Sequence, residues 1–200
     1  MATQPHTAFV TLDDFLATVE VTEDRSEYVD GRVVAMAGAS FAHNVIVQNI
    51  SGMLYSRLRG GPCRVLGQGM LLKPKHAENA FLPDVLVVCG QPQIEHRHAD
   101  LLMNPVLLIE VLSPSTADYD HGKKWENYRR IPTVQDYLLV SQDRPRVERY
   151  TRHGDGLWLF SETAGVDGEI RLDSVNAALP LAEIYEGVPA SEARSAESFG

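Results

Sequence analysis

The chain has 200 residues, of which 44% are hydrophobic, so it can form one domain with a substantial core and cannot be disordered throughout. The N-terminal residues lack the pattern of a secretory signal, and no apolar run approaches the roughly 20 residues that span a bilayer, so we expect a soluble, cytoplasmic protein. The formal net charge of -9 argues against a nucleic-acid partner, because phosphate binding depends on Lys and Arg.

A short helix and a hairpin are expected near the N-terminus. Thr11 opens the helix, because Asp13 and Asp14 then lie in its first turn, where the helix dipole favours negative charge. Two strand-like runs follow, and they flank the Asp-Gly dipeptide that two-residue hairpin turns prefer. The runs are 27–29 and 32–36, around Asp30-Gly31.

A long helix is predicted over 41–59, because its apolar residues recur at helical spacing and a pair of glycines follows it. The apolar residues are Ile46, Ile50, Met53 and Leu54, and the glycines are Gly60 and Gly61.

The rest of the chain predicts an α/β fold. Nearly continuous apolar runs indicate strands that are buried on both faces, and a helix separates them from further strands. Strands are expected at 63–72, 83–89, 105–112, 136–141, 147–151 and 157–161, and the helix at 119–130. The core order is therefore helix, three strands, helix, strand, within a single domain over 1–186. Residues 187–200 are rich in Ala, Ser and Glu and are expected to form a flexible tail.

Charge is distributed unevenly along the chain. Acidic residues crowd the beginning: Asp13, Asp14, Glu20, Glu23, Asp24, Glu27 and Asp30. Basic residues cluster later: Lys123, Lys124, Arg129, Arg130, Arg144, Arg146, Arg149 and Arg152. The sequence leaves open whether these cations form a binding face or lie on solvated surfaces.

Cys63 and Cys89 form no CxxC pair and have no neighbouring ligand cluster. This pattern supports neither a zinc site nor a disulfide framework, so we expect two buried thiols in a reducing compartment.

Two acidic residues interrupt apolar strands. Glu110 lies near the end of 105–112, and Asp84 opens the apolar run 83–89. A lone buried carboxylate is costly and requires a metal, a cation or a proton, so neighbouring strands would let both acids reach one cation. Magnesium suits such a site, because it is held by one or two carboxylates while it keeps waters. The alternative for each acid is a strand-end salt bridge or a turn cap.

Asp120, Lys124 and Tyr128 stand four residues apart, so they share one face of the predicted helix. This helix follows the loop after Glu110, so Lys124 can approach a metal-bound water and a scissile phosphate. The alternative is an ordinary helical pair between Asp120 and Lys124, with Tyr128 packed on the sheet.

These motifs resemble known nucleases. Pro83-Asp84 followed by Glu110-Val111-Leu112 resembles the PD-(D/E)xK nuclease signature. The longer string from Glu110 to Thr116, Glu-Val-Leu-Ser-Pro-Ser-Thr, followed by Asp120, Lys124 and Tyr128, is similar to the Uma-two family of putative restriction endonucleases. The resemblance extends from about residue 27 to residue 185. It implies a restriction-endonuclease-like mixed sheet with an αβββαβ core, an N-terminal hairpin and a C-terminal β extension.

The resemblance also implies roles for individual residues. Asp84 and Glu110 would bind Mg²⁺ or Mn²⁺, with the carbonyl of Val111 as a further ligand. Leu112 stands where the general signature has its lysine, and the family implies that the lysine of the following helix substitutes for it. Lys124 is preferred to Lys123 for this role, because it has the four-residue spacing to Asp120 and Tyr128. Asp120 and Tyr128 could themselves contact substrate or orient the metal ligands.

Two further residues have alternative interpretations. Glu27 matches an acidic residue of the family and could complete the metal site, or it could be a surface glutamate at a strand edge. His43 lies on the helix face of Ile46 and Ile50, so it should point inward. It could be a core histidine, or it could contact substrate or support a metal ligand.

The function implied by the resemblance is metal-dependent hydrolysis of DNA, and a homodimer would be the simplest way to cut both strands. One alternative is a nuclease-like fold that serves as a non-catalytic binding or regulatory module. Another is a metal-dependent hydrolase that acts on some other phosphoester.

Overall fold

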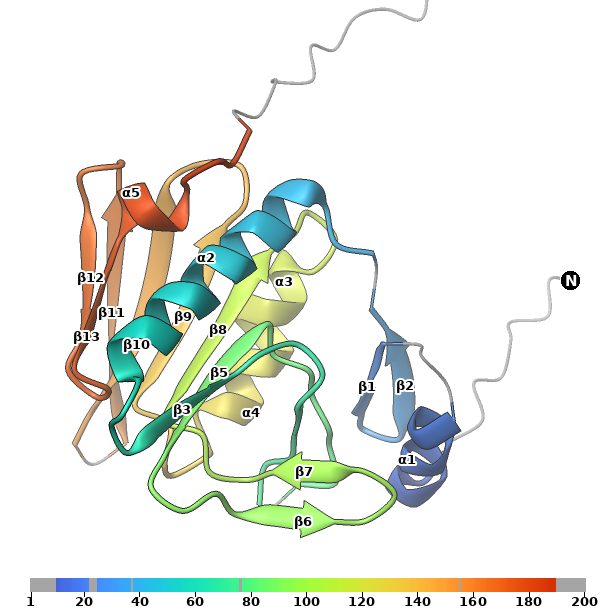
Figure 1. The fold of residues 1–200 in the computed structure, drawn as a ribbon. Coiled ribbons are helices and arrows are strands. Elements are labelled where there is room, and N and C mark those ends of the chain that lie inside the picture. Colours follow the sequence, from blue (N-terminus) through green and yellow to red (C-terminus); the bar gives the residue numbers. More distant parts are fainter. Residues whose placement is uncertain (1–9, 22–24, 37, 76, 155, 190–200) are drawn as a thin grey trace, which may run out of the picture.

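The computed structural model describes residues 10–21, 25–36, 38–75, 77–154 and 156–189 (Figure 1). The helical segments are α1 (Leu12–Val21), α2 (Phe41–Leu58), α3 (Ala117–Tyr119), η1 (Asp120–Lys124), α4 (Trp125–Tyr128) and α5 (Leu181–Ile184). The first strands are β1 (Ser26–Val29), β2 (Arg32–Ala35), β3 (Cys63–Leu66), β4 (Leu71–Leu72), β5 (Val85–Cys89), β6 (Ile94–His96) and β7 (Asp100–Leu102). The later strands are β8 (Leu107–Leu112), β9 (Asp136–Ser141), β10 (Arg146–His153), β11 (Leu157–Ala164), β12 (Glu169–Leu172) and β13 (Ala177–Pro180).

A mixed sheet of six strands forms the centre of the fold, in the order β11-β10-β9-β8-β5-β3. Only β8 and β9 run parallel within it, and their connection contains the helical segments α3, η1 and α4. The remaining pairs are antiparallel. This arrangement confirms the predicted αβββαβ order with its hairpin and its C-terminal β extension.

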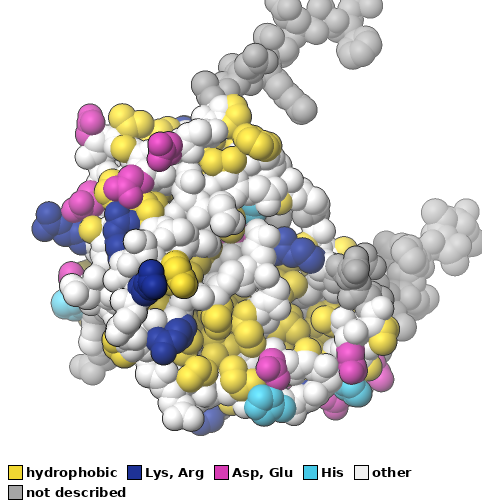
Figure 2. Space-filling view, viewed as in Figure 1, with side chains coloured by type: hydrophobic (Ala, Val, Ile, Leu, Met, Phe, Trp, Pro, Cys, Tyr) yellow, Lys and Arg dark blue, Asp and Glu magenta, His cyan; other side chains and the backbone are white. Residues whose placement is uncertain are grey.

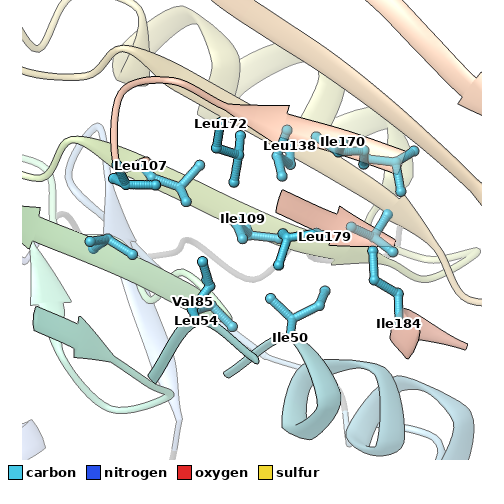
Figure 3. Packing of buried hydrophobic residues seen from close by; sticks show 14 of the residues in the cluster. Ile50, Leu54, Val85, Leu107, Ile109, Leu138, Ile170, Leu172, Leu179 and Ile184 are labelled. Atoms are coloured by element: carbon cyan, nitrogen blue, oxygen red, sulfur yellow. The ribbon is translucent and has the colours of Figure 1, made fainter. Parts of the chain in front are cut away.

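One face of the sheet is covered by α2, together with α5 and the β12–β13 hairpin (Figure 1). Ile46, Ile50 and Leu54 of α2 are fully buried, as their spacing predicts. They belong to the same apolar cluster as Ile109 of β8 and Leu179 of β13 (Figure 3). Alternate residues of β8 point to opposite faces, so Ile109 and Val111 lie on this side.

The opposite face packs against the segment 117–128, which consists of α3, η1 and α4. Leu108, Tyr128 and Tyr137 lie in its apolar cluster. The middle of the segment is a π-helical turn, in which the amide of Trp125 donates to the carbonyl of Asp120. Such wide turns interrupt the regular helix and are frequent at functional sites.

The predicted N-terminal elements are confirmed in their details. Asp30 and Gly31 both have positive φ, 49° and 79°, which is the backbone that the tight hairpin turn between β1 and β2 requires. Thr11 and Asp14 cap the start of α1 through reciprocal side-chain hydrogen bonds.

The long helix α2 begins at a capping serine: the side chain of Ser40 accepts a hydrogen bond from the amide of His43.

Several boundaries differ from the prediction. The run 63–72 divides into β3 and β4, because β4 leaves the central sheet and pairs with β7. The helix predicted over 119–130 covers 117–128. The strands β6, β7, β12 and β13 and the helix α5 were not predicted, because most of them are short and mix polar with apolar residues. Residues 190–200 of the predicted tail lie outside the described residues.

The expectation of two buried thiols is wrong, because Cys63 and Cys89 form a disulfide. They are direct partners in the antiparallel register of β3 and β5. Their separation of 26 residues gives no local signal, and only the pairing of the two strands brings them together.

Among the described residues, no helix is long and apolar enough to cross a membrane.

The α2 face should carry a large share of the stability. Ile50 is fully buried, so Ile50→Ala should lower the free energy of unfolding by about 2–5 kcal/mol, from lost burial and the cavity left behind. Tyr55 lies on the same helix with 65% exposure, and Tyr55→Ala should change the free energy by no more than about 0.5 kcal/mol. Urea denaturation of both variants checks this, and equal losses would contradict the packing described.

Candidate active site

A cavity of about 530 Å³ opens where β5 and β8 meet the start of α2. Its walls come from β2, the start of α2, the loop after β8 and the helical segment 117–128. The residues proposed from the sequence that line it are Glu27, His43, Asp84, Glu110, Val111, Asp120 and Lys124. Tyr128 lies directly behind Glu110, to which it is hydrogen-bonded.

The strand register brings Asp84 and Glu110 together. Val85 pairs with Ile109 in the antiparallel ladder of β5 and β8, so the next residues along, Asp84 and Glu110, lie at the same end of the two strands. Both are almost completely buried, with exposures of 4% and 2%. The carboxyl groups therefore face one cavity and do not lie on opposite sides of the sheet.

The ammonium group of Lys124 lies among three carboxylates. Its Nζ is 3.0 Å from Glu110 Oε1, 3.2 Å from Glu27 Oε1 and 3.3 Å from Asp120 Oδ1. Lys124 is only 2% exposed, so water screens these attractions little. Burial alone would lower the pKa of Lys124, but the attraction to the three carboxylates outweighs it and raises the pKa well above its ordinary value.

Two tyrosines hold the carboxylates in place. The hydroxyl of Tyr128 donates to Glu110 Oε1 at 2.9 Å, and the hydroxyl of Tyr119 donates to Glu27 Oε2 at 2.8 Å. Burial and the negative charge nearby raise the pKa of both hydroxyl groups, so they stay protonated and act as donors. Glu27 Oε1 also accepts the amide of Leu82, so both oxygens of Glu27 have protein donors.

The environments of Glu110 and Asp84 have opposite effects on their acidity. Burial raises the pKa of Glu110 well above its ordinary value, and neighbouring carboxylates add to this increase while Lys124 opposes it. Burial would also raise the pKa of Asp84, but the contact with His43 and the amide of Val111 outweigh it and lower the pKa. Asp84 is therefore ionised, whereas Glu110 gains from any further cation in the cavity.

Each oxygen of Asp84 has an identified donor. His43 Nε2 lies 3.1 Å from Oδ1, and Gln68 Nε2 donates to the same atom at 3.3 Å. The amide of Val111 donates to Oδ2 at 2.8 Å. His43 thus points inward, as its helix face predicted. Sequence reasoning missed Gln68, because it lies in the loop between β3 and β4 without a motif around it.

The two candidate lysines have different surroundings. Lys124 reaches the carboxylates, whereas Lys123 forms an exposed pair with Asp30 of the hairpin turn. Leu112 is half-buried and packs against the apolar cluster on the side of the sheet that faces the segment 117–128. Of the two lysines, only Lys124 has its ammonium group against Glu110, and Glu27 lies in the cavity and not on the surface.

Four carboxylates and two permanent cations line the cavity, so the carboxylates are in excess and suit a divalent cation by charge. Glu110 Oε2 and the second lone pair of Asp84 Oδ2 have no partner among the described residues. Within the described residues, no group of three or more His, Cys, Asp or Glu side chains is arranged as a metal site.

Three of the later basic residues are engaged within the fold. The guanidinium of Arg149 is paired with the buried carboxylate of Asp136, and that of Arg152 donates to three backbone carbonyls. Arg146 is paired with Glu148 and Glu162. On the face shown in Figure 2, Lys and Arg side chains lie in separate places and are mixed with acidic ones. These three arginines therefore make contacts within the fold.

The sheet order and the helices on both faces define an α/β protein with a nuclease-like fold. The same fold occurs in the crystal structure of a putative nuclease belonging to DUF820 from Anabaena variabilis. The TM-score is 0.71 with 18% sequence identity, over 88% of this chain and 98% of that chain.

The chain belongs to the Uma2 family, described as putative restriction endonuclease, whose model matches residues 12–182. Two uncharacterized proteins of Synechocystis sp. are relatives. One is 35% identical over 82% of this chain and 93% of its own length, and the other is 33% identical over 88% and 91%. The family resemblance inferred from the sequence is confirmed.

Lys124 should be necessary for stability. Lys124→Met leaves three buried carboxylates without their counter-charge and should lower the free energy of unfolding by about 3–5 kcal/mol. Lys123→Met removes only a partly exposed pair at the protein surface and should cost about 1 kcal/mol or less. Chemical denaturation at neutral pH compares the two adjacent substitutions. A Lys124→Met protein as stable as the wild type would contradict the charge balance described.

Proposed function

We propose that this protein is a metal-dependent endonuclease that hydrolyses phosphodiester bonds of DNA. The observation that carries the proposal is the placement of Lys124 Nζ 3.0 Å from Glu110, in a cavity that Asp84 also lines. Hydrolysis of a phosphodiester requires stabilisation of negative charge and an activated water, and these groups supply the elements of both. Membership of the Uma2 family supports the same reaction class.

In this proposal, Asp84 and Glu110 hold Mg²⁺ or Mn²⁺ with the carbonyl of Val111. A divalent ion there supplies a Lewis acid that polarises a phosphate oxygen and lowers the pKa of a bound water. Asp84 is suited to anchor the ion, because its pKa is already lowered and its carboxylate is fixed by His43 and Val111.

Lys124 stabilises the charge that develops on the phosphoryl oxygens. It remains an ammonium group, because Glu27, Glu110 and Asp120 surround it. Glu27 acts in this proposal mainly by positioning Lys124, since both its oxygens already accept protein hydrogen bonds. Tyr128 orients Glu110 through its hydroxyl, and Asp120 fixes the other side of the lysine.

A homodimer is part of the proposal, because one cavity cuts one strand and a two-fold pair would cut a duplex. The rival function, a non-catalytic module, is favoured by the net charge of -9 and by Leu112 at the position of the signature lysine. Retention of Lys124 against Glu110 favours catalysis instead.

Asp84→Asn should abolish cleavage without unfolding the protein. The amide keeps an oxygen for the Val111 amide, but it removes the charge that holds the ion. Cleavage of supercoiled plasmid in Mg²⁺ or Mn²⁺ should fall by at least about a hundredfold, since a catalytic ion contributes several kcal/mol. The control is Asp100→Asn, because Asp100 is exposed and does not line the cavity.

Chelation of the metal should remove the activity of the wild type in the same assay. Undiminished cleavage by Asp84→Asn would refute the site. Calorimetric binding of Mn²⁺ by the wild type, lost in Glu110→Gln, without any cleavage would instead establish the non-catalytic module.

A further inference from the structure

Arg25 is a second cation of the cavity, and no sequence motif marks it. It precedes β1, lines the cavity, and accepts the amide of Met36 with its carbonyl. Among the described residues that line the cavity, Lys124 and Arg25 are the two with a permanent positive charge. Lys124 is already engaged by three carboxylates, whereas Arg25 forms no ion pair among the described residues.

The guanidinium of Arg25 has one edge without a partner. Its Nη1 donates to Gln68 Oε1 at 3.3 Å, which fixes one end of the group. The Nε and Nη2 atoms are buried and have no hydrogen-bond partner among the described residues. Leaving buried donors unpaired is costly, by about 1–3 kcal/mol each and more for charged groups, so such atoms need an explanation.

The two unpaired atoms lie on the same edge of the planar guanidinium, where their N–H bonds point in nearly parallel directions. This edge matches two oxygens of one phosphate group, and the guanidinium is well suited to such two-point binding. A lysine at this position would provide a charge without the matching pair of donors.

The position of Arg25 is coupled to the metal-binding candidate. Gln68 accepts from Arg25 Nη1 and donates from Nε2 to Asp84 Oδ1, at 3.3 Å in each case. One amide side chain therefore holds both Arg25 and Asp84. A phosphate bound to Arg25 would therefore lie at a fixed distance from a metal ion bound to Asp84.

We propose that Arg25 binds a backbone phosphate of the nucleic-acid substrate next to the one that is cut, through Nε and Nη2. The inference rests on the proposed function and adds the residue that compensates for an acidic cavity. In a chain with a net charge of -9, substrate phosphates need such a local cation.

The first test uses nuclear magnetic resonance of the Arg25 Nε–H group, assigned by its disappearance in Arg25→Gln. The probe is thymidine 3′,5′-bisphosphate, which carries two phosphate groups spaced as on a DNA strand. The resonance should move and saturate as the probe is added. No movement up to about 10 mM, at which a site with a Kd of 1 mM would be nearly full, overturns the proposal.

The second test measures binding of a fluorescent DNA duplex in Ca²⁺ with Arg25→Gln, Arg25→Lys and Arg59→Gln. Arg59 is exposed at the far end of α2, so its substitution changes the net charge equally without altering the cavity. Arg25→Gln should weaken binding about tenfold or more and lower the salt slope by about 1, while Arg59→Gln should do neither. Arg25→Lys should recover the salt slope but only part of the affinity.

Stability separates ligand binding from a structural role. A structural arginine would cost stability when removed, but Arg25→Gln should leave the melting temperature unchanged or raise it, because it removes buried donors that lack partners. The bisphosphate should raise the melting temperature of the wild type and not that of the variant. A clear loss of stability in Arg25→Gln, without a loss of phosphate or DNA binding, overturns the proposal.

The two proposals fail in different ways. If the wild type cleaves DNA and Arg25→Gln binds and cleaves equally well, the role of Arg25 is refuted and the endonuclease stands. If the wild type does not cleave while its Arg25 resonance still responds to the bisphosphate, the endonuclease is refuted and the phosphate site stands.

Discussion

The ammonium group of Lys124 inside the protein is the interaction on which the site depends. Glu27 comes from the hairpin, Glu110 from the central sheet and Asp120 from the helical segment, and one cation holds all three. Each of these carboxylates would be costly to bury alone, so the three elements are stable together only while the lysine is present. Lys124 and its three carboxylates thereby hold the β1–β2 hairpin against the central sheet and form part of the cavity wall.

Much of this arrangement could be predicted from the sequence, because the signals were local. Apolar runs identified β5, β8 and β9, and an acidic residue within each of the first two runs marked the place where a charge had to be compensated. Four-residue spacing placed Lys124 and Tyr128 on one helix face, and both reach Glu110. The inward direction of His43 followed in the same way from Ile46 and Ile50 of its helix.

The parts that could not be predicted depend on contacts between distant segments. The disulfide of Cys63 and Cys89 follows only from the register of β3 against β5. Gln68 and Arg25 lie in irregular segments, so no periodicity showed that Gln68 contacts Asp84 or that Arg25 contacts Gln68. The sequence left open whether the basic residues of β10 bind a partner or face solvent, but Arg149 is paired with buried Asp136, whose position depends on strand pairing.

The π-helical turn at 120–124 limits insertions and deletions in the helical segment 117–128. It adds backbone between Asp120 and Trp125, whose i to i+5 bond replaces the usual one. Each residue of a helix turns the chain by about 100°. A deletion in the turn would therefore rotate α3 relative to α4, so that the two helices could no longer both face the sheet. Surface loops usually tolerate insertions and deletions, whereas this short stretch acts as a spacer of fixed length.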